Sequence, residues 1–190
     1  DVNKGDDLCP KHRSRLVARQ LKATDHSGNN YFAPTPPLES LRTVLSMAVT
    51  TMGNHQPCLD PQSPHRSQIS LVDVSRAYFN AKTDPNDPCY VELPPEEGDD
   101  GKNCGLLLRH MYGTRPAADG WQEEYSTMLI QELGVLQGQS SPNLFHHAQR
   151  GIVTTVHGDD FTTNGAADQL DWFEEAVAER YEITVGPRIG

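Results

Sequence analysis

The chain has 190 residues, of which 36% are hydrophobic and 22% are charged, with 14 prolines and 15 glycines. This length is sufficient for one domain with a sizeable core, and the composition is typical of a loop-rich globular protein. The formal net charge of −10 argues against nucleic-acid binding through the overall field of the protein, although a local basic segment can still bind phosphates.

The cysteines and the apolar runs bear on the compartment of the protein. None of the four cysteines belongs to a CxxC pair: Cys9, Cys58, Cys89 and Cys104. This spacing favours reduced thiols in an intracellular protein over a disulfide framework or a zinc site. No apolar run approaches the ~20 residues of a membrane helix, and the first residues lack the apolar core of a signal peptide. We expect a soluble protein that is not secreted and has no membrane partner.

A basic segment, KHRSRLVARQLK, occupies residues 11–22 and surrounds a short apolar strand pattern at 16–18. Its cations are Lys11, Arg13, Arg15, Arg19 and Lys22. One interpretation is a solvated strand edge that its charges protect from aggregation. The other is a surface that faces phosphates.

The next element is a helix that follows the Pro-rich stretch YFAPTPPLES. Glu39 or Ser40 is placed to cap it, and the following apolar residues recur at helical spacing. These residues are Leu41, Val44, Leu45, Ala48 and Val49. The Gly- and Pro-rich stretch 53–66 predicts a loop, which we interpret as an insertion.

The stretch QISLVDVSRAYFNA predicts a strand that runs into a turn or a short helix, with Asp73 at the junction. Folds of the α/β class place their chemistry at the carboxyl ends of strands, which suggests a functional carboxylate. The alternative is that Asp73 simply caps the following helix, a role that Asp fills well.

Three further elements follow. A short strand is expected within CYVEL, between turn-rich acidic segments. A helix is expected over 117–133 with Gly134 at its C-cap, and an amphipathic helix near the end of the chain. The apolar residues of these helices indicate core rather than a cofactor site: Trp121, Tyr125, Met128, Leu129 and Leu133 in the first, and Leu170, Phe173, Val177 and Tyr181 in the second.

Between these two helices, GIVTTVHGDDFTTNG predicts a hairpin with Asp159 and Asp160 at its tip. Asp-Asp also occurs at 6–7 and 99–100, so the dipeptide alone is not specific. Only the third pair has β-forming residues on both sides, and a rigid carboxylate pair is costly unless a cation neutralises it. With Asp73 at the same edge of a sheet, the three would form an oxygen-rich Mg²⁺ site, in which the carboxylates of Asp73 and Asp159 should lie about 3 to 6 Å apart. The order of elements predicts a small sheet backed by helices.

Six blocks of this sequence carry a resemblance to a known family. They are RLVARQ, APT with SLRTVLSMA, LVDVSRAYFNA, CYVELPPE, MYGTRPAADGW, and HGDD followed by a helix. In this order, from about residue 11 to 186, they resemble the reverse transcriptase of Ty1/copia-type LTR retrotransposons. The resemblance implies an α/β (α+β) fold with right-hand polymerase fingers and palm, the palm being a ferredoxin-like antiparallel sheet backed by helices.

The domain organisation follows from the same resemblance. Residues 1–66 and 85–116 would be fingers-like, 67–84 would be the palm strand with the first catalytic aspartate, and 117–190 the palm with the HGDD hairpin. The thumb and RNase H regions would not be part of this chain, which we expect to be a fragment of a Gag-Pol-like polyprotein. Its location would be the cytoplasm, within virus-like particles, or the nucleus.

The resemblance also implies roles for residues. The catalytic residues would be Asp73, Asp159 and Asp160, which with Val74 would bind two Mg²⁺ or Mn²⁺ ions. The dNTP would contact Arg15, Arg19, Ser75, Arg76, Ala77, Tyr78 and Arg115. Tyr78 would lie under the sugar, whereas without the resemblance it would be a core aromatic. The template and primer, RNA or DNA, would contact Lys11, Arg13, Lys22, His157 and Gly158.

Three positions depart from the pattern of the family. His157 and Gly158 stand where an aromatic and an apolar residue usually precede the aspartates, and Pro116 replaces a Gln. These departures leave more than one function open. The first hypothesis is an RNA-directed DNA polymerase that extends a primer 3′-hydroxyl. The second is a non-catalytic retrotransposon relic with at most weak nucleic-acid binding. A third is another Mg²⁺-dependent phosphoryl-transfer enzyme on a similar sheet.

Overall fold

The structure is a computed structural model that describes most of the chain. The described residues are 2–3, 8–10, 12–13, 16–21, 30–31, 37–51, 56–63, 65–97 and 101–190. Within these ranges, none of the helices combines the length and the apolar character that crossing a membrane requires.

Six antiparallel strands form the main sheet, in the spatial order β10-β3-β9-β8-β7-β6. Their bounds are β3 Ser67–Val74, β6 Leu136–Gln137, β7 Leu144–His147, β8 Ile152–His157, β9 Asp160–Ala166 and β10 Ile183–Val185. The hairpin predicted around HGDD is confirmed as β8 and β9. Two short strand pairs lie apart from the sheet: β1 (Val2–Asn3) with β2 (His12–Arg13), and β4 (Tyr90–Glu92) with β5 (Cys104–Leu106).

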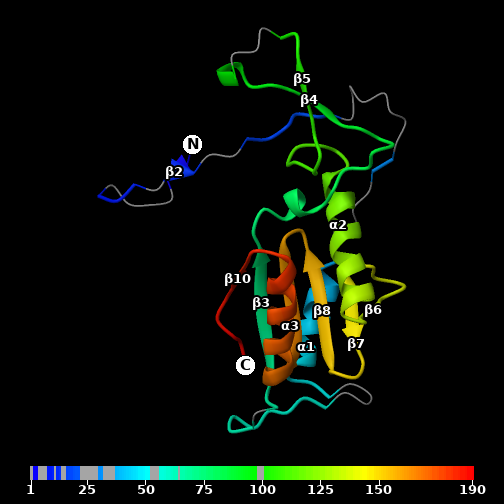
Figure 1. The fold of residues 1–190 in the computed structure, drawn as a ribbon. Coiled ribbons are helices and arrows are strands. Elements are labelled where there is room, and N and C mark those ends of the chain that lie inside the picture. The colour runs from blue at the N-terminus through cyan, green and yellow to red at the C-terminus, as the bar shows by residue number, and fades with distance from the viewer. Residues whose placement is uncertain are drawn as a thin grey trace.

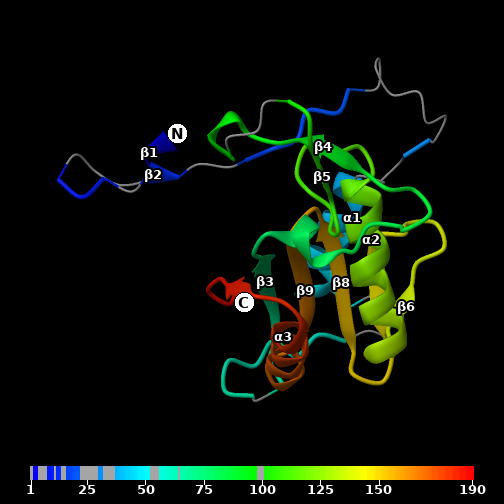
Figure 2. The same ribbon diagram turned by 45° about the horizontal axis from the view of Figure 1, so that its top comes forward.

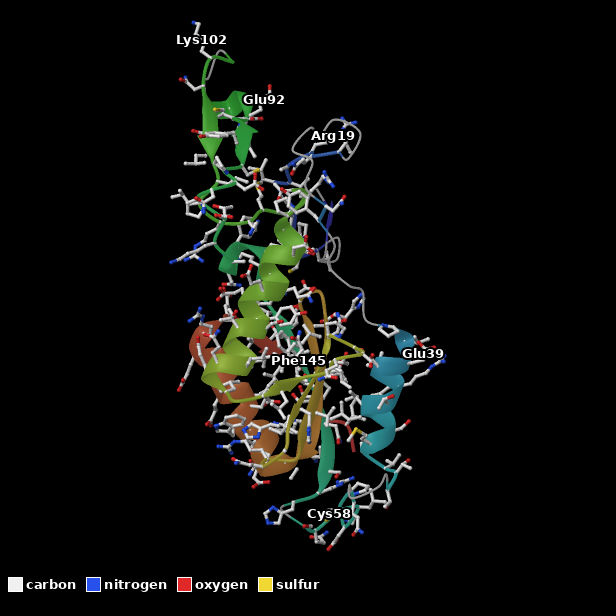
Figure 3. The ribbon with its side chains drawn as sticks, turned by 90° about the vertical axis from the view of Figure 1, so that its right-hand side faces the viewer. Arg19, Glu39, Cys58, Glu92, Lys102 and Phe145 are labelled. Atoms are coloured by element: carbon white, nitrogen blue, oxygen red, sulfur yellow. The ribbon has the colours of Figure 1, made fainter. Side chains whose placement is uncertain are left out.

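Three α-helices occur in the described part of the chain: α1 Leu38–Met47, α2 Ala117–Thr127 and α3 Ala167–Arg180. A π-helical turn, η4 (Met128–Glu132), continues α2, and two short 3-10 helices are η2 (Ala77–Asn80) and η3 (Pro95–Glu97). Helices α2 and α3 cover one face of the sheet and α1 covers the other (Figure 1, Figure 3). The prediction of a mixed α/β fold with an antiparallel sheet is confirmed.

The apolar core lies between the sheet and helices α2 and α3. Strand residues that alternate toward this face, such as Val72, Val156 and Phe161, belong to the same buried cluster as residues of both helices. The helix residues of the core are Trp121, Tyr125, Met128, Leu129, Phe173 and Val177, each at most 4% exposed. Truncation of a buried phenylalanine such as Phe161 to Ala would cost roughly 3–5 kcal/mol. The stripes predicted for the two helices are confirmed.

Helix α1 differs from its predicted form. It begins at Leu38, directly after Pro37, so a cap at Glu39 or Ser40 is wrong. Pro37 is the N-cap residue, with an extended backbone and no side-chain capping hydrogen bond, and because proline has no N–H it adds no unsatisfied donor at this end of the helix. The apolar face is also narrower than predicted, since Leu45 and Val49 are 40% and 65% exposed.

The strand predicted at 16–18 is wrong as well. Residues 16–21 form no strand and instead lie along the loop before α2, where the N–H of Ala18 donates to the carbonyl of Tyr112 at 2.8 Å. The close approach depends on Gly113, which has a φ of +88° and whose Cβ, if present, would lie 1.8 Å from the carbonyl oxygen of Ala18. Because this contact involves an irregular loop, no regular strand ladder forms.

The end of the sheet at which β3 and β8 terminate is the end that carries the candidate site. The β4–β5 pair lies beyond this end, past the first turn of α2 (Figure 1, Figure 2). Segments from both the first and the middle part of the chain therefore gather where the sheet's carboxylates lie.

Candidate metal centre

Asp73 lies within strand β3, one residue before the strand ends at Val74. In the pairing of β3 with β9, Asp73 is directly opposite Asp160. The interpretation of Asp73 as a helix N-cap is wrong, because the residue before the 3-10 helix η2 is Arg76. Antiparallel register, rather than closeness in sequence, brings these two carboxylates together.

The tip of the β8–β9 hairpin supplies the other carboxylate. His157 pairs with Asp160, so Gly158 and Asp159 are the two central residues of the turn. Gly158 has a φ of +63°, which matches the first central position of a type II′ turn. Glycine adopts this conformation without steric cost, so the departure at this position is compatible with a well-formed turn.

The three carboxylates form a compact group. Each of Asp73, Asp159 and Asp160 offers one oxygen, and these oxygens all lie within 4.8 Å of one another. Burial raises the pKa of Asp160, and the charges of Asp159 and Asp73 raise it further, while His157 opposes the shift. Because the carboxylates repel one another, a divalent cation bound between them would be stabilising, and an all-oxygen donor set suits Mg²⁺ or Mn²⁺.

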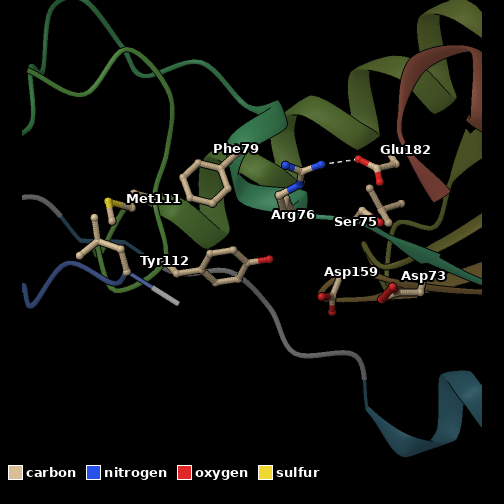
Figure 4. Close-up of a pocket in the computed structure, with 10 residues that line it drawn as sticks. Asp73, Ser75, Arg76, Phe79, Met111, Tyr112, Asp159 and Glu182 are labelled. Carbon is tan, nitrogen blue, oxygen red and sulfur yellow. Dashed lines mark hydrogen bonds and ion pairs between the residues drawn. The ribbon is translucent and has the colours of Figure 1, made fainter. Parts of the chain in front are cut away.

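Two of the carboxylates, Asp73 and Asp159, line a cavity of about 730 Å³, whereas Asp160 is not among its lining residues (Figure 4). Its lining residues are Leu16, Asp73, Val74, Ser75, Arg76, Phe79, Met111, Tyr112, Asp159 and Glu182. Five residues assigned to the site by resemblance are among them: Asp73, Val74, Ser75, Arg76 and Asp159. The N–H of Val74 also donates to the carbonyl of Asp159 at 2.9 Å, which ties β3 to the hairpin tip.

Among the described residues that line this cavity, Arg76 is the one with a cationic side chain. Its backbone φ of 55° lies in the left-handed region, which a residue with a side chain rarely adopts. Its guanidinium forms an ion pair with Glu182, which follows α3 and also lines the cavity (Figure 4). The sequence did not predict a role for Glu182 at the site, because Glu182 and Arg76 meet only through the pairing of β10 with β3.

Aromatic side chains form the wall of the cavity that lies across from the carboxylates (Figure 4). Phe79 and Tyr112 line it, with ring centroids 5.7 Å apart. Tyr78 is half-buried, lies beside Tyr112 with ring centroids 4.6 Å apart and the rings tilted by 40°, and packs against the core. Burial, with a contribution from Asp159, raises the pKa of Tyr78. The sequence did not predict a role for Phe79 or Tyr112 in the site, since neither belongs to a residue spacing that is typical of a binding site.

Several residues assigned by resemblance lie elsewhere. Ala77 is 1% exposed and belongs to the core. Arg19 lines a different cavity, beside Tyr31, and the guanidinium of Arg115 lies over the Tyr31 ring at 5.0 Å. The structure therefore does not bring Arg19 or Arg115 into the carboxylate cavity.

The rest of the basic segment is only partly described. Lys11, Arg15 and Lys22 lie outside the described residues, and Arg13 pairs with Val2 in the short β1–β2 pair. His157 is exposed and lies next to Asp160 across the hairpin. The choice between a solvated edge and a phosphate-facing surface for residues 11–22 stays open.

Trp121 makes a contact that the sequence did not predict. Its ring is buried in the core, and its indole Nε1–H donates to the carbonyl of Gly158 at 2.7 Å. Helical spacing predicted the buried ring, but nothing in the spacing indicated where its polar atom would point.

No protein-family model matches this chain, and no curated protein matches it. The function is therefore inferred from the residues and their geometry.

Proposed function

We propose that this chain is the fingers and palm portion of a Ty1/copia-type reverse transcriptase, an RNA-directed DNA polymerase. The observation that carries the proposal is the meeting of Asp73, Asp159 and Asp160, from two separate segments, at one end of an antiparallel sheet. In this assignment residues 67–84 and 117–190 are the palm, helix α1 backs the palm sheet, and the other described parts of residues 1–66 and residues 85–116 are fingers-like.

In this assignment Asp73, Asp159 and Asp160, together with Val74, would hold two Mg²⁺ or Mn²⁺ ions, and the close approach of the three carboxylates supports a metal at this position. Bound ions of this kind stabilise the attacking and leaving oxygens of a phosphoryl transfer. In the proposed reaction the primer 3′-hydroxyl oxygen bonds to the α-phosphorus of a dNTP. The bond from that phosphorus to the pyrophosphate oxygen breaks, and the hydroxyl proton passes to solvent.

The cavity supports a nucleotide as the substrate. Its volume of about 730 Å³ lies within the range usual for small-molecule sites. One side carries carboxylates that would hold the phosphates through the metal, and the other carries Phe79 and Tyr112, against which a base or sugar can pack. Ser75 and Arg76 also line the cavity, where they would contact the triphosphate.

The partners follow from this assignment. The template and primer would approach across the end of the sheet, and further domains of a Gag-Pol-like polyprotein would complete the enzyme. The protein would act in the cytoplasm within virus-like particles, or in the nucleus.

Primer extension tests the proposal. The purified chain is incubated with a primed RNA template, dNTPs and Mg²⁺ or Mn²⁺, beside the variants Asp159→Asn and Asp168→Asn. We expect metal-dependent extension that Asp159→Asn abolishes and that Asp168→Asn leaves intact, because Asp168 lies at the start of α3, at the opposite end of β9. Extension that persists without metal or in Asp159→Asn would contradict the proposal.

A second candidate is a non-catalytic relic that keeps this fold. The observation that favours it is the ion pair of Arg76 with Glu182, which neutralises the cation of an otherwise acidic cavity. Mn²⁺ binding without extension, in a longer protein with its thumb, would select the relic.

A further inference from the structure

Trp121 connects helix α2 to the tip of the β8–β9 hairpin. Its Nε1–H donates to the carbonyl of Gly158 at 2.7 Å, which is a short hydrogen bond for this pair of groups. Gly158 directly precedes Asp159 and lies two residues before Asp160, so the bond acts beside two of the three clustered carboxylates.

The donor is held in place by its surroundings. Trp121 is 1% exposed, and its ring packs edge-on against Tyr125 and Tyr181, with centroids at 5.4 and 5.1 Å. The core contacts come from the same helix and from the residue after α3, so the indole has little freedom to follow the hairpin if the tip moves.

The acceptor has no side chain of its own to anchor it. Gly158 is exposed, and no atom lies within 4 Å of the position where its Cβ would be. Two successive carbonyls of the turn are bonded to the body of the protein from different sides. The carbonyl of Gly158 accepts from Trp121, and that of Asp159 accepts from the N–H of Val74 at 2.9 Å.

We propose that Trp121 is a positioning residue that fixes the turn through its indole N–H and thereby sets the spacing of the carboxylates. The part that concerns metal binding rests on the proposed function. The mutual repulsion of the three carboxylates would otherwise push the tip away from β3, and the two carbonyl bonds oppose this movement. Trp121 belongs to the aromatic core and yet acts on the site through a single polar atom.

The test removes the N–H and keeps the ring. Trp172 is first replaced by Phe, because Trp121 is then the single tryptophan of the chain. Tryptophan is next exchanged for β-(benzothien-3-yl)alanine, in which sulfur replaces the indole N–H. The Trp172→Phe protein with ordinary tryptophan is the matched control.

Amide hydrogen exchange, measured without metal, is the first readout. The amide of Val74, which binds the tip, should exchange about fivefold faster in the substituted protein, the factor expected for one ordinary hydrogen bond. The amide of Ile69, which binds the carbonyl of Ile189 at the other end of β3, should not change. No change at Val74, or an equal change at both amides, would overturn the proposal, because the indole would then act only in packing.

Mn²⁺ affinity, measured by the paramagnetic signal of the free ion, is the second readout. We expect a loss of about tenfold, as for other groups that hold metal ligands in place. An unchanged affinity beside faster exchange at Val74 would overturn the positioning role. If the control protein binds no Mn²⁺, the proposed function is overturned. Faster exchange at Val74 in the substituted protein would then still support the role of Trp121 in fixing the hairpin tip.

Discussion

Asp73 on β3 and Asp160 on β9 are direct cross-strand partners in an antiparallel sheet. Like charges in this position destabilise the strand pair, and Asp159 adds a third charge beside them. The protein therefore carries an electrostatic cost at this end of the sheet that a bound cation would remove.

Replacing Asp160 by Asn should stabilise the metal-free protein at neutral pH, by roughly 0.5 kcal/mol because solvent screens these charges. The folded state raises the pKa of Asp160 above its ordinary value of 3.8, so the folded protein holds the proton more tightly than the unfolded chain. The stability of the unsubstituted protein thus falls, relative to Asp160→Asn, as the pH rises from 3.8 through the raised pKa. Urea denaturation in a chelator, from acidic to neutral pH, measures the difference. A difference that stays constant with pH would refute this account.

Gly158 and Gly151 form a matched pair at the two ends of strand β8. Both have a φ of +63°, and neither has an atom within 4 Å of its Cβ position. Substitution by Ala should therefore cost each protein about 1 kcal/mol in the free energy of unfolding, through backbone strain alone. Only Gly158→Ala should also weaken Mn²⁺ binding, because only Gly158 adjoins the carboxylates. Equal Mn²⁺ affinities in the two variants would show that the conformation of the turn at Gly158 does not affect metal binding.

Gly113 controls the docking of residues 16–21. A Cβ there would lie 1.8 Å from the carbonyl oxygen of Ala18, so Gly113→Ala should release this segment. Trypsin should then cleave after Arg19 several times faster. Gly101→Ala is the control, because Gly101 also has a positive φ, of +80°, but no atom lies near its Cβ position. Equal cleavage rates would show that the segment does not depend on this contact.

The ion pair of Arg76 with Glu182 should limit anion binding in the cavity. Glu182→Gln removes the competing carboxylate, and we expect roughly two- to fivefold tighter binding of pyrophosphate in the presence of Mg²⁺, since an exposed ion pair contributes up to about 1 kcal/mol. Calorimetric titration provides the measurement. Glu132→Gln, which breaks an exposed pair with Arg180, is the control and should leave binding unchanged. Weaker binding in Glu182→Gln would mean that Glu182 orients Arg76 instead of competing for it.

The sequence by itself determined the regular elements of the core. The spacing of Trp121, Tyr125 and Met128 predicted α2, and the β-forming flanks of HGDD predicted the β8–β9 hairpin. Periodicity of this kind is local, because a helix or a strand must present its apolar residues to one side. It also sufficed to single out Asp73, Asp159 and Asp160 as candidates.

Only the tertiary structure decided how these residues meet. The register of β3 with β9 placed Asp73 opposite Asp160, and the pairing of β10 with β3 brought Glu182 to Arg76. The packing of α2 against the sheet also directed the indole N–H of Trp121 toward the hairpin tip. Such contacts join segments far apart in the chain through single polar atoms. Apolar periodicity sets which face of an element is buried, and it carries no information about the partner of one N–H or one carboxylate.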